Sequence, residues 1–292
     1  MCRLPILLLT ASSLWAEPSF RLQPGVAKLS CPAITEASGL AVSPTDPRFL
    51  WIINDSGGGT EIHLTETDGT ARGSVTMRDA ENRDWEDLAS FTLGGKPYLL
   101  IADTGDNESK RESCMLYIIP EPQLPPDGGN ISGKTGPARE IRFTYEDGPR
   151  DCEAVAVDPE GGKIILVSKR TDPPGVYELP LAPAKHPIAR KVGTTGPKAG
   201  GLVLPIAFRN QPTGMDISAD GGMAAIVTYH GVFVFRRAKG ATWADAISVE
   251  PLQPGAHGLA QAEAVAISRD GKTIFAVSEK ANSPIVRYCL AE

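Results

Sequence analysis

The sequence predicts an all-β protein whose strands form a β-propeller. The first observation is composition: the 292 residues include 30 Gly and 25 Pro, which destabilise helix interiors by about 1 and 3 kcal/mol relative to Ala. The second is a short-strand pattern that returns five times along the chain. Together they predict five detectable four-stranded blades. The main alternative adds a sixth blade within residues 120–150 or 183–212, and the other is a β-sandwich.

Each copy of the repeat begins with a small or acidic residue, followed by alternating apolar residues. The five copies start at Ser38, Glu86, Glu153, Thr213 and Glu263. In three of them an Asp-Gly or Gly-Gly turn predicts a tight hairpin, because glycine adopts the positive φ that such turns require. Second strands are expected at residues 49–53, 98–102, 164–168, 224–228 and 273–278, and third strands at 61–64, 115–119, 176–181, 232–236 and 285–289. The fourth strands are less clear.

The last copy lacks room for a fourth strand, since the chain from Glu263 to its C-terminus is long enough for only three. Residues 20–29 precede the first copy and have no other place in the repeat. They are therefore expected to complete the last blade and close the ring. Closure of this kind removes exposed strand edges, which would otherwise aggregate.

Residues 1–16 are expected to be a secretory signal peptide, and residues 17–292 a single propeller domain. Arg3 precedes an apolar stretch at residues 4–9, and small residues lead up to Glu17, which is the layout of a cleaved export signal. The apolar stretch is much shorter than the ~20 residues of a spanning helix. We expect a periplasmic or secreted monomer without a membrane span.

Four cysteines follow the expected signal peptide: Cys31, Cys114, Cys152 and Cys289. An even number suits disulfides in an oxidising compartment and allows three connectivities. Cys114 and Cys152 both fall at one mouth of the channel in the blade arrangement, so they are the preferred pair.

Polar residues recur at one register of every copy, where the first strand of a blade starts and the second ends at the same mouth of the channel. These positions hold Glu36, Ser38, Asp55, Asp84, Glu86, Asp103, Asp151, Glu153, Lys169, Gln211, Thr213, Tyr229, Gln261, Glu263 and Glu279. Converging carboxylates are stable as anions only with cations among them, and hard oxygen ligands favour Ca²⁺. The alternative is that Arg83, Arg150 and Lys169 neutralise the acids.

The charge distribution limits the partners of such a mouth. The net charge is -6, and Lys and Arg are scattered without a basic run, which argues against nucleic acid. A small molecule or carbohydrate at the channel mouth is the expected ligand.

Several strings resemble a family of exported bacterial propeller proteins: SGLA at residues 38–41, WIINDSGG at 51–58, NRDWED at 82–87, ADTGDN at 102–107 and DCEA at 151–154. More distantly, the chain is similar to esterase-like phytases and to other TolB-like or NHL-type propellers. It departs from these relatives in showing five copies where six blades are usual, and in lacking a dense basic cluster.

The phytase-like resemblance implies calcium held by channel carboxylates and hydrolysis of phosphate esters at that face. On the matching positions it implies the metal ligands Glu86, Glu153, Glu263, Asp55 and Asp103. It also implies that Arg83, Arg150 and Lys169 contact the phosphate, and Glu153 is grouped with them as catalytic.

Two functions from different classes remain open. The first is a metal-dependent hydrolase of phosphate or other esters, in which a carboxylate-bound cation activates water. The second is a non-enzymatic module that binds a sugar, peptide or protein at the same mouth, with calcium in a structural role. The sequence offers no compelling nucleophile or general base, which adds weight to the second function.

Overall fold

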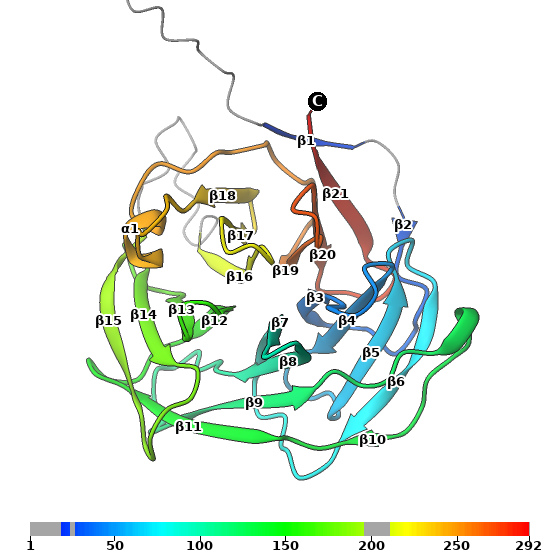
Figure 1. The fold of residues 1–292 in the computed structure, drawn as a ribbon, viewed down its shortest axis with the longest axis horizontal. Helices are drawn as coiled ribbons and strands as arrows, with labels where there is room; N and C mark the ends of the chain where they lie inside the picture. The colour runs from blue at the N-terminus through cyan, green and yellow to red at the C-terminus, as the bar shows by residue number, and fades with distance from the viewer. Residues whose placement is uncertain (1–18, 24–26, 196–210, 292) are drawn as a thin grey trace, which may run out of the picture.

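The computed structural model describes residues 19–23, 27–195 and 211–291. The expected signal peptide at residues 1–16 lies outside the described residues, as do residues 196–210 of one stretch considered for a sixth blade. Within the described residues the chain is all-β, as predicted, and its sheets surround a common centre in a propeller-like arrangement (Figure 1).

The strands pair into antiparallel units that follow the order of the chain. The first unit contains β3 (Ala37–Val42), β4 (Phe49–Asn54), β5 (Glu61–Glu66) and β6 (Ala71–Met77). The second contains β7 (Trp85–Leu93), β8 (Lys96–Asp103), β9 (Cys114–Pro120) and β11 (Arg139–Tyr145). The third contains β12 (Cys152–Asp158), β13 (Lys163–Ser168), β14 (Gly175–Pro180) and β15 (Ile188–Thr194). The next contains β16 (Pro212–Ile217), β17 (Met223–Thr228) and β18 (Val232–Arg236).

The last unit joins the two ends of the described chain. It contains β19 (Ala262–Ile267), β20 (Thr273–Ser278), β21 (Pro284–Leu290) and β1 (Phe20–Leu22), and β2 (Ala27–Lys28) also pairs with β21. Phe20 lies opposite Leu290 in this antiparallel pairing. The N-terminal segment therefore completes the last sheet, as the sequence predicts.

The stretch 120–150 forms no sheet of its own, which corrects one of the two positions considered for a sixth blade. Its strand β10 (Lys134–Thr135) pairs in parallel with β6 of the first unit. Its strand β11 is the outer strand of the second unit and also pairs in parallel with β15, so that two units merge into one eight-stranded sheet. This stretch therefore adds strands to the first and second units and joins the second unit to the third.

Helical structure is minor in the described part of the chain. It consists of a 3-10 turn, η1 (Pro126–Gly128), and one short helix, α1 (Trp243–Ile247). Thr242 and Asp245 cap the start of α1 reciprocally. No helix within the described ranges is long and apolar enough to cross a membrane.

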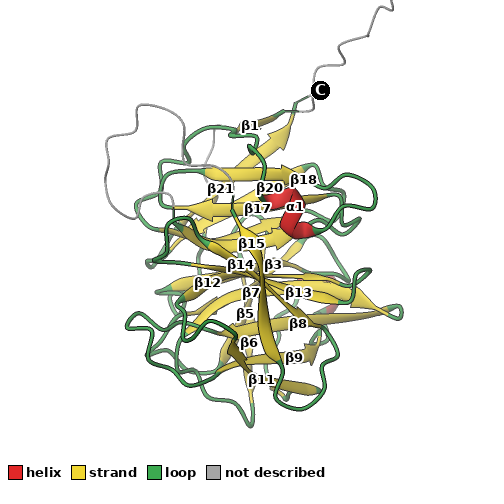
Figure 2. Ribbon diagram, turned by 90° about the vertical axis from the view of Figure 1, so that its left-hand side faces the viewer, coloured by secondary structure: helices red, strands yellow, loops and turns green. Residues whose placement is uncertain are grey.

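The first strand of each unit lies innermost, and these strands close a ring. Strands β3, β7, β12, β16 and β19 pack in succession, and β19 packs against β3. Glycine permits a close approach between β3 and β7, because a Cβ on Gly39 would lie 2.6 Å from the backbone nitrogen of Leu88. In the side view most loops gather on the two faces of the ring (Figure 2).

A buried carboxylate connects three of the inner strands. Asp87 is fully buried, and its Oδ2 accepts hydrogen bonds from the backbone N–H groups of Val155 (2.7 Å) and Met215 (2.9 Å). Its Oδ1 accepts from Leu88 N–H at 2.8 Å. Burial raises the pKa of Asp87 well above its usual range, although these three hydrogen bonds oppose the shift. The centre of the ring is therefore packed with protein at Asp87.

The predicted Cys114–Cys152 disulfide is wrong for this structure, in which Cys31, Cys114, Cys152 and Cys289 are all free. Cys114 and Cys152 belong instead to one buried apolar cluster. The Cys152 thiol donates to the backbone oxygen atoms of Ala154 and Val167. Buried thiols of this kind pack as small apolar groups.

Candidate functional site

Each inner strand carries a β-bulge at the same position, where one extra residue interrupts its pairing with the second strand. The extra residues are Ser38, Glu86, Glu153, Thr213 and Glu263. They are the same residues at which the five copies of the sequence repeat start. A bulge bends the strand and re-aims a side chain, so the repeat places one polar side chain per unit at equivalent positions.

The two hydroxyl residues among these five are satisfied by the next inner strand. Ser38 Oγ donates to the backbone oxygen of Trp85, and Thr213 Oγ1 donates to that of Ala262, each at 2.7 Å. An ionised carboxylate has no proton to donate. The three glutamates therefore need partners of a different kind.

Glu153 and Glu263 obtain partners from a buried hydrogen-bond chain. Lys169 Nζ forms an ion pair with Glu153 and also donates to the Tyr229 hydroxyl at 3.0 Å. Tyr229 in turn donates to Glu263 Oε1 at 2.8 Å. Lys169 and Glu153 are 4% and 6% exposed at their side chains, so Lys169 has little freedom to reach a ligand in the mouth.

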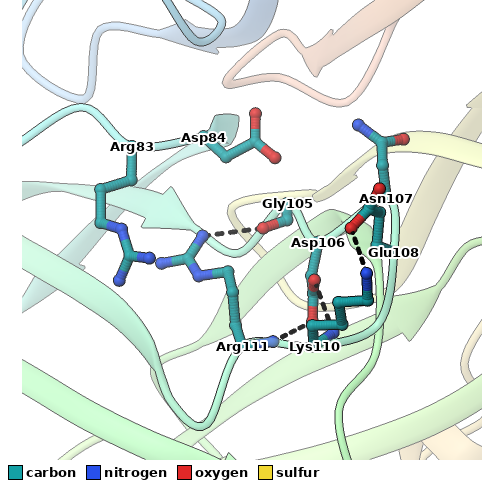
Figure 3. A pocket seen from close by; sticks show the side chains of 8 residues that line it. All are labelled: Arg83, Asp84, Gly105, Asp106, Asn107, Glu108, Lys110 and Arg111. Atoms are coloured by element: carbon teal, nitrogen blue, oxygen red, sulfur yellow. Dashed lines mark hydrogen bonds and ion pairs between the residues drawn. The ribbon is translucent and has the colours of Figure 1, made fainter.

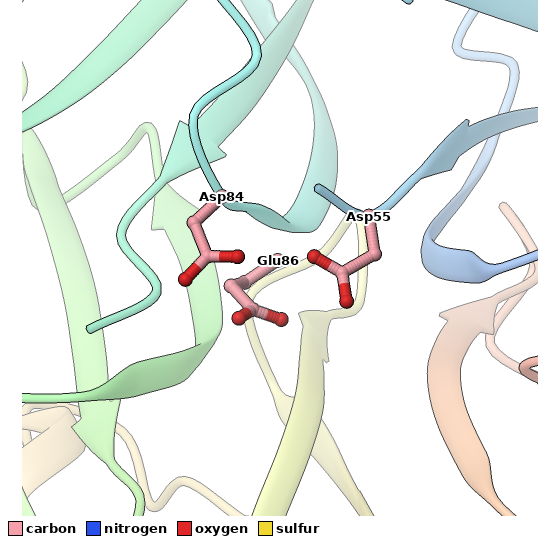
Figure 4. A group of neighbouring side chains, drawn as sticks. All are labelled: Asp55, Asp84 and Glu86. Atoms are coloured by element: carbon pink, nitrogen blue, oxygen red, sulfur yellow. The ribbon is translucent and has the colours of Figure 1, made fainter. Parts of the chain in front are cut away.

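Glu86 has no such partner. Only 5% of the residue is exposed, and none of the described residues donates a hydrogen bond or forms an ion pair with its carboxylate. It faces the carboxylates of Asp55 and Asp84 instead (Figure 4). One oxygen from each of these three residues can be chosen so that all lie within 4.8 Å of one another.

The electrostatics of this trio are unfavourable without a cation. Burial raises the pKa of Glu86 well above its usual range, and repulsion from Glu153, Asp55 and Asp84 adds to the effect. Burial also raises the pKa of Asp55 to about 7, with further repulsion from Asp84 and against a hydrogen bond from the Ser56 N–H. Such a cluster ionises fully only when a positive charge enters it.

Gly105 leaves the space that the trio occupies. A Cβ at this position would overlap Glu86 Oε1 and the Asp84 carboxylate. The backbone N–H of Gly105 is hydrogen-bonded to the backbone oxygen of Asp84 at 3.2 Å, which holds the two loops together. Any larger residue at position 105 of the 102–107 string would therefore clash with these carboxylates.

A second carboxylate group shares Glu86 and contains Asp151 and Glu153. Here the protein supplies its own cations. Arg170 Nε lies 2.5 Å from Asp151 Oδ2, and Lys169 pairs with Glu153. Asp151 Oδ1 also accepts the backbone N–H of Asp106 at 2.9 Å.

Two predicted metal ligands, Asp103 and Glu263, lie in neither group. Arg111 Nη1 lies 2.8 Å from Asp103 Oδ1, so that carboxylate is already neutralised. Glu263 accepts from Tyr229, as described above. Of the predicted ligand set, the structure brings together Asp55 with Glu86, and Glu86 with Glu153.

A hollow of about 250 Å³ adjoins the trio and is lined by Arg83, Asp84, Gly105, Asp106, Asn107, Glu108, Lys110 and Arg111 (Figure 3). Most of its polar groups bond to one another. Asp106 accepts the backbone N–H groups of Lys110 and Arg111, and Lys110 pairs with Glu108. Arg83 is exposed and makes no hydrogen bond or ion pair within the described residues. It is the guanidinium that this hollow leaves available to an anion.

The structure does not bring Arg150 to the acidic groups. Its guanidinium bonds to the Tyr177 hydroxyl at 3.1 Å and forms an ion pair with Asp147 at 3.0 Å. No hydrogen bond or ion pair in the described part of the chain links it to the carboxylates of the mouth.

Sequence reasoning missed Arg170 and Arg111, and it placed Asp84 and Asp151 in the acidic register without counting them among the metal ligands. Arg170 directly follows Lys169 at a second-strand end, so its register signal could have identified it. Arg111 lies in a loop between β8 and β9, where no repeat register applies.

No family model matches the chain, and no curated protein matches it. Among solved structures, one from Bacteroides uniformis, provisionally assigned as a 6-phosphogluconolactonase, is similar at 15% identity and a TM-score of 0.42. The match covers 90% of this chain and 71% of that one.

Proposed function

We propose that the mouth of the ring binds one divalent cation, with calcium as the best match, through Asp55, Asp84 and Glu86. The observation that carries this proposal is the Glu86 carboxylate, which is almost fully buried, lies beside the Asp55 and Asp84 carboxylates, and has no hydrogen-bond donor or ion-pair partner among the described residues. An all-oxygen donor set with flexible carboxylates suits Ca²⁺. Without a cation, the burial and mutual repulsion of these acids would destabilise the folded state.

We further propose that the site hydrolyses phosphate or other esters. When bound, a divalent cation would polarise the ester oxygen and lower the pKa of a coordinated water. Arg83, exposed at the rim of the adjoining hollow, would hold an anionic group of the substrate beside the trio. Gly105 leaves room for the carboxylates, and the packed centre around Asp87 supports them from below.

We also propose the domain organisation, the location and the oligomeric state of the protein. The antiparallel units are interpreted as five blades of one propeller domain at residues 17–292, with the β11–β15 pairing as an extra link. The protein is proposed to be an exported monomer, periplasmic or secreted, that belongs to the bacterial propeller family which it resembles. Glu153, Lys169 and Arg150 remain predicted catalytic residues, although the contacts described above favour Arg83.

Calcium titration calorimetry on the chelator-treated protein tests the cation site. We expect about one calcium ion per chain in the wild type and affinity about 100-fold weaker in Glu86→Gln, since a central charged ligand is lost. Glu263→Gln is the matched control, because it removes a buried bulge glutamate that lies outside the trio, and it should retain affinity within about threefold. No calcium uptake by the wild type would overturn the proposal.

A screen of phosphomonoesters and carboxylic esters, with and without chelator, then tests the activity. Calcium-dependent turnover that Glu86→Gln abolishes would support the hydrolase. Calcium binding without any turnover would favour the alternative function, a binding module with structural calcium. The free Arg83 would then hold an anionic ligand that is not consumed.

A further inference from the structure

We propose that Lys169, assisted by Arg170, occupies the place of a second divalent cation, so that the mouth holds one cation where its carboxylates could hold two. This inference rests on the proposed cation site and concerns the other half of the same cluster. The trio Asp55–Asp84–Glu86 and the group Glu86–Asp151–Glu153 share Glu86, and each could hold an ion.

The two halves differ in their built-in positive charge. Lys169 forms an ion pair with Glu153, and Arg170 lies 2.5 Å from Asp151. No Lys or Arg pairs with the other half in the described residues. Lys169 and Arg170 therefore neutralise the half that contains Asp151 and Glu153. Glu86 stays unpaired and is available to a cation in the half that contains Asp55 and Asp84.

Lys169 is held in place as a fixed cation. Its side chain is 4% exposed, and its Nζ also donates to Tyr229 and lies 5.0 Å from the centre of that ring. Its ion pair with Glu153 favours the charged ammonium form. An ammonium provides one positive charge without exchanging with solvent ions.

Both carboxylate oxygens of Asp151 have partners within the protein. Its second oxygen accepts the backbone N–H of Asp106, and Arg170 also bonds to Asn107. Asp151 thus ties the loop after β8 to the loop after β13. A metal ion in this half would have to compete with these contacts as well as with Lys169.

The experiment measures calcium stoichiometry by calorimetry and by elemental analysis of the chelator-treated protein. Lys169→Met removes the charge and keeps an unbranched side chain that is one heavy atom shorter. We expect the stoichiometry to rise from about one calcium ion per chain in the wild type to about two. Lys169→Arg is the matched control and should remain at about one.

Failure of this inference is distinguishable from failure of the proposed function. One ion in both the wild type and Lys169→Met would overturn the inference alone. No ion in the wild type but one in Lys169→Met would overturn the proposed function and support the role of Lys169. No ion in either protein would overturn both.

A second variant tests the inference if Lys169→Met does not fold. Lys169→Gln removes the charge and keeps a hydrogen-bond donor for Glu153 and Tyr229. We expect it to bind about two calcium ions per chain, as Lys169→Met does. One ion per chain in both Lys169→Gln and the wild type would overturn the inference.

Discussion

Glu86 and Asp87 are adjacent in the sequence and almost equally buried, yet they belong to regions with opposite properties. Asp87 lies at the packed centre, where three backbone N–H groups satisfy its carboxylate. Glu86 lies at the mouth, where its neighbours are other acids. Burial therefore does not distinguish a structural acid from a ligand-binding one, whereas the supply of hydrogen-bond donors does.

The difference predicts that the centre governs stability and the mouth governs binding. Removing an acid from the centre leaves buried donors unpaired. Removing an acid from the mouth relieves repulsion and would remove a ligand of the proposed cation site. Three experiments test this contrast, in order of decreasing effect.

Asp87→Ala should have the largest effect on folding. It leaves three buried N–H groups unpaired, and the expected loss is on the order of 3–5 kcal/mol of unfolding free energy. Asp216→Ala should cost less, because within the described residues Asp216 accepts two such bonds, from Ile217 and Ile267. Chemical denaturation measures both, and equal losses in the two variants would contradict the explanation. If Asp87→Ala does not fold, Asp87→Asn keeps one acceptor and should fall between it and the wild type.

Gly105→Ala should weaken calcium binding with little loss of stability. The added Cβ would displace the Glu86 and Asp84 carboxylates, and we expect affinity to fall about tenfold, or about 1.4 kcal/mol. Gly136→Ala is the control, since a Cβ there would meet only Arg78, at 3.9 Å. Titration calorimetry decides between them, and unchanged affinity in Gly105→Ala would place the ion elsewhere.

The pH dependence of stability should show a smaller effect. Because the pKa of Asp55 rises from 3.8 to about 7 on folding, the folded state binds more protons between those values. The contribution of Asp55 to the free energy of unfolding therefore falls as pH rises through this window. In chelator, the melting temperature of the wild type relative to Asp55→Asn should fall by a few degrees from pH 4 to pH 7. Calcium should abolish this fall, and a fall that persists in calcium would argue against a cation beside Asp55.

The repeat was predictable because its signals are local. Alternating apolar residues and glycine turns depend on neighbouring residues only, and the predicted second and third strands lie within a few residues of the observed ones. The bulge positions also coincide with the acidic or small residue that starts each copy. Which carboxylates remain unpaired was not predictable, because it depends on which acids the arginines reach. Arg111 pairs with Asp103 from a loop outside the repeat register, and Arg170 pairs with Asp151.

The sequence by itself determined the all-β class, the order of strands and the register that gathers acids at one mouth. Each of these follows from side-chain alternation and turn chemistry within a few residues. Only the tertiary structure decided that Lys169 and Tyr229 serve Glu153 and Glu263, while Glu86 faces Asp55 and Asp84. The contacts from Lys169 to Tyr229, from Tyr229 to Glu263 and between Asp55 and Glu86 join side chains from different units, so they form only when the ring closes.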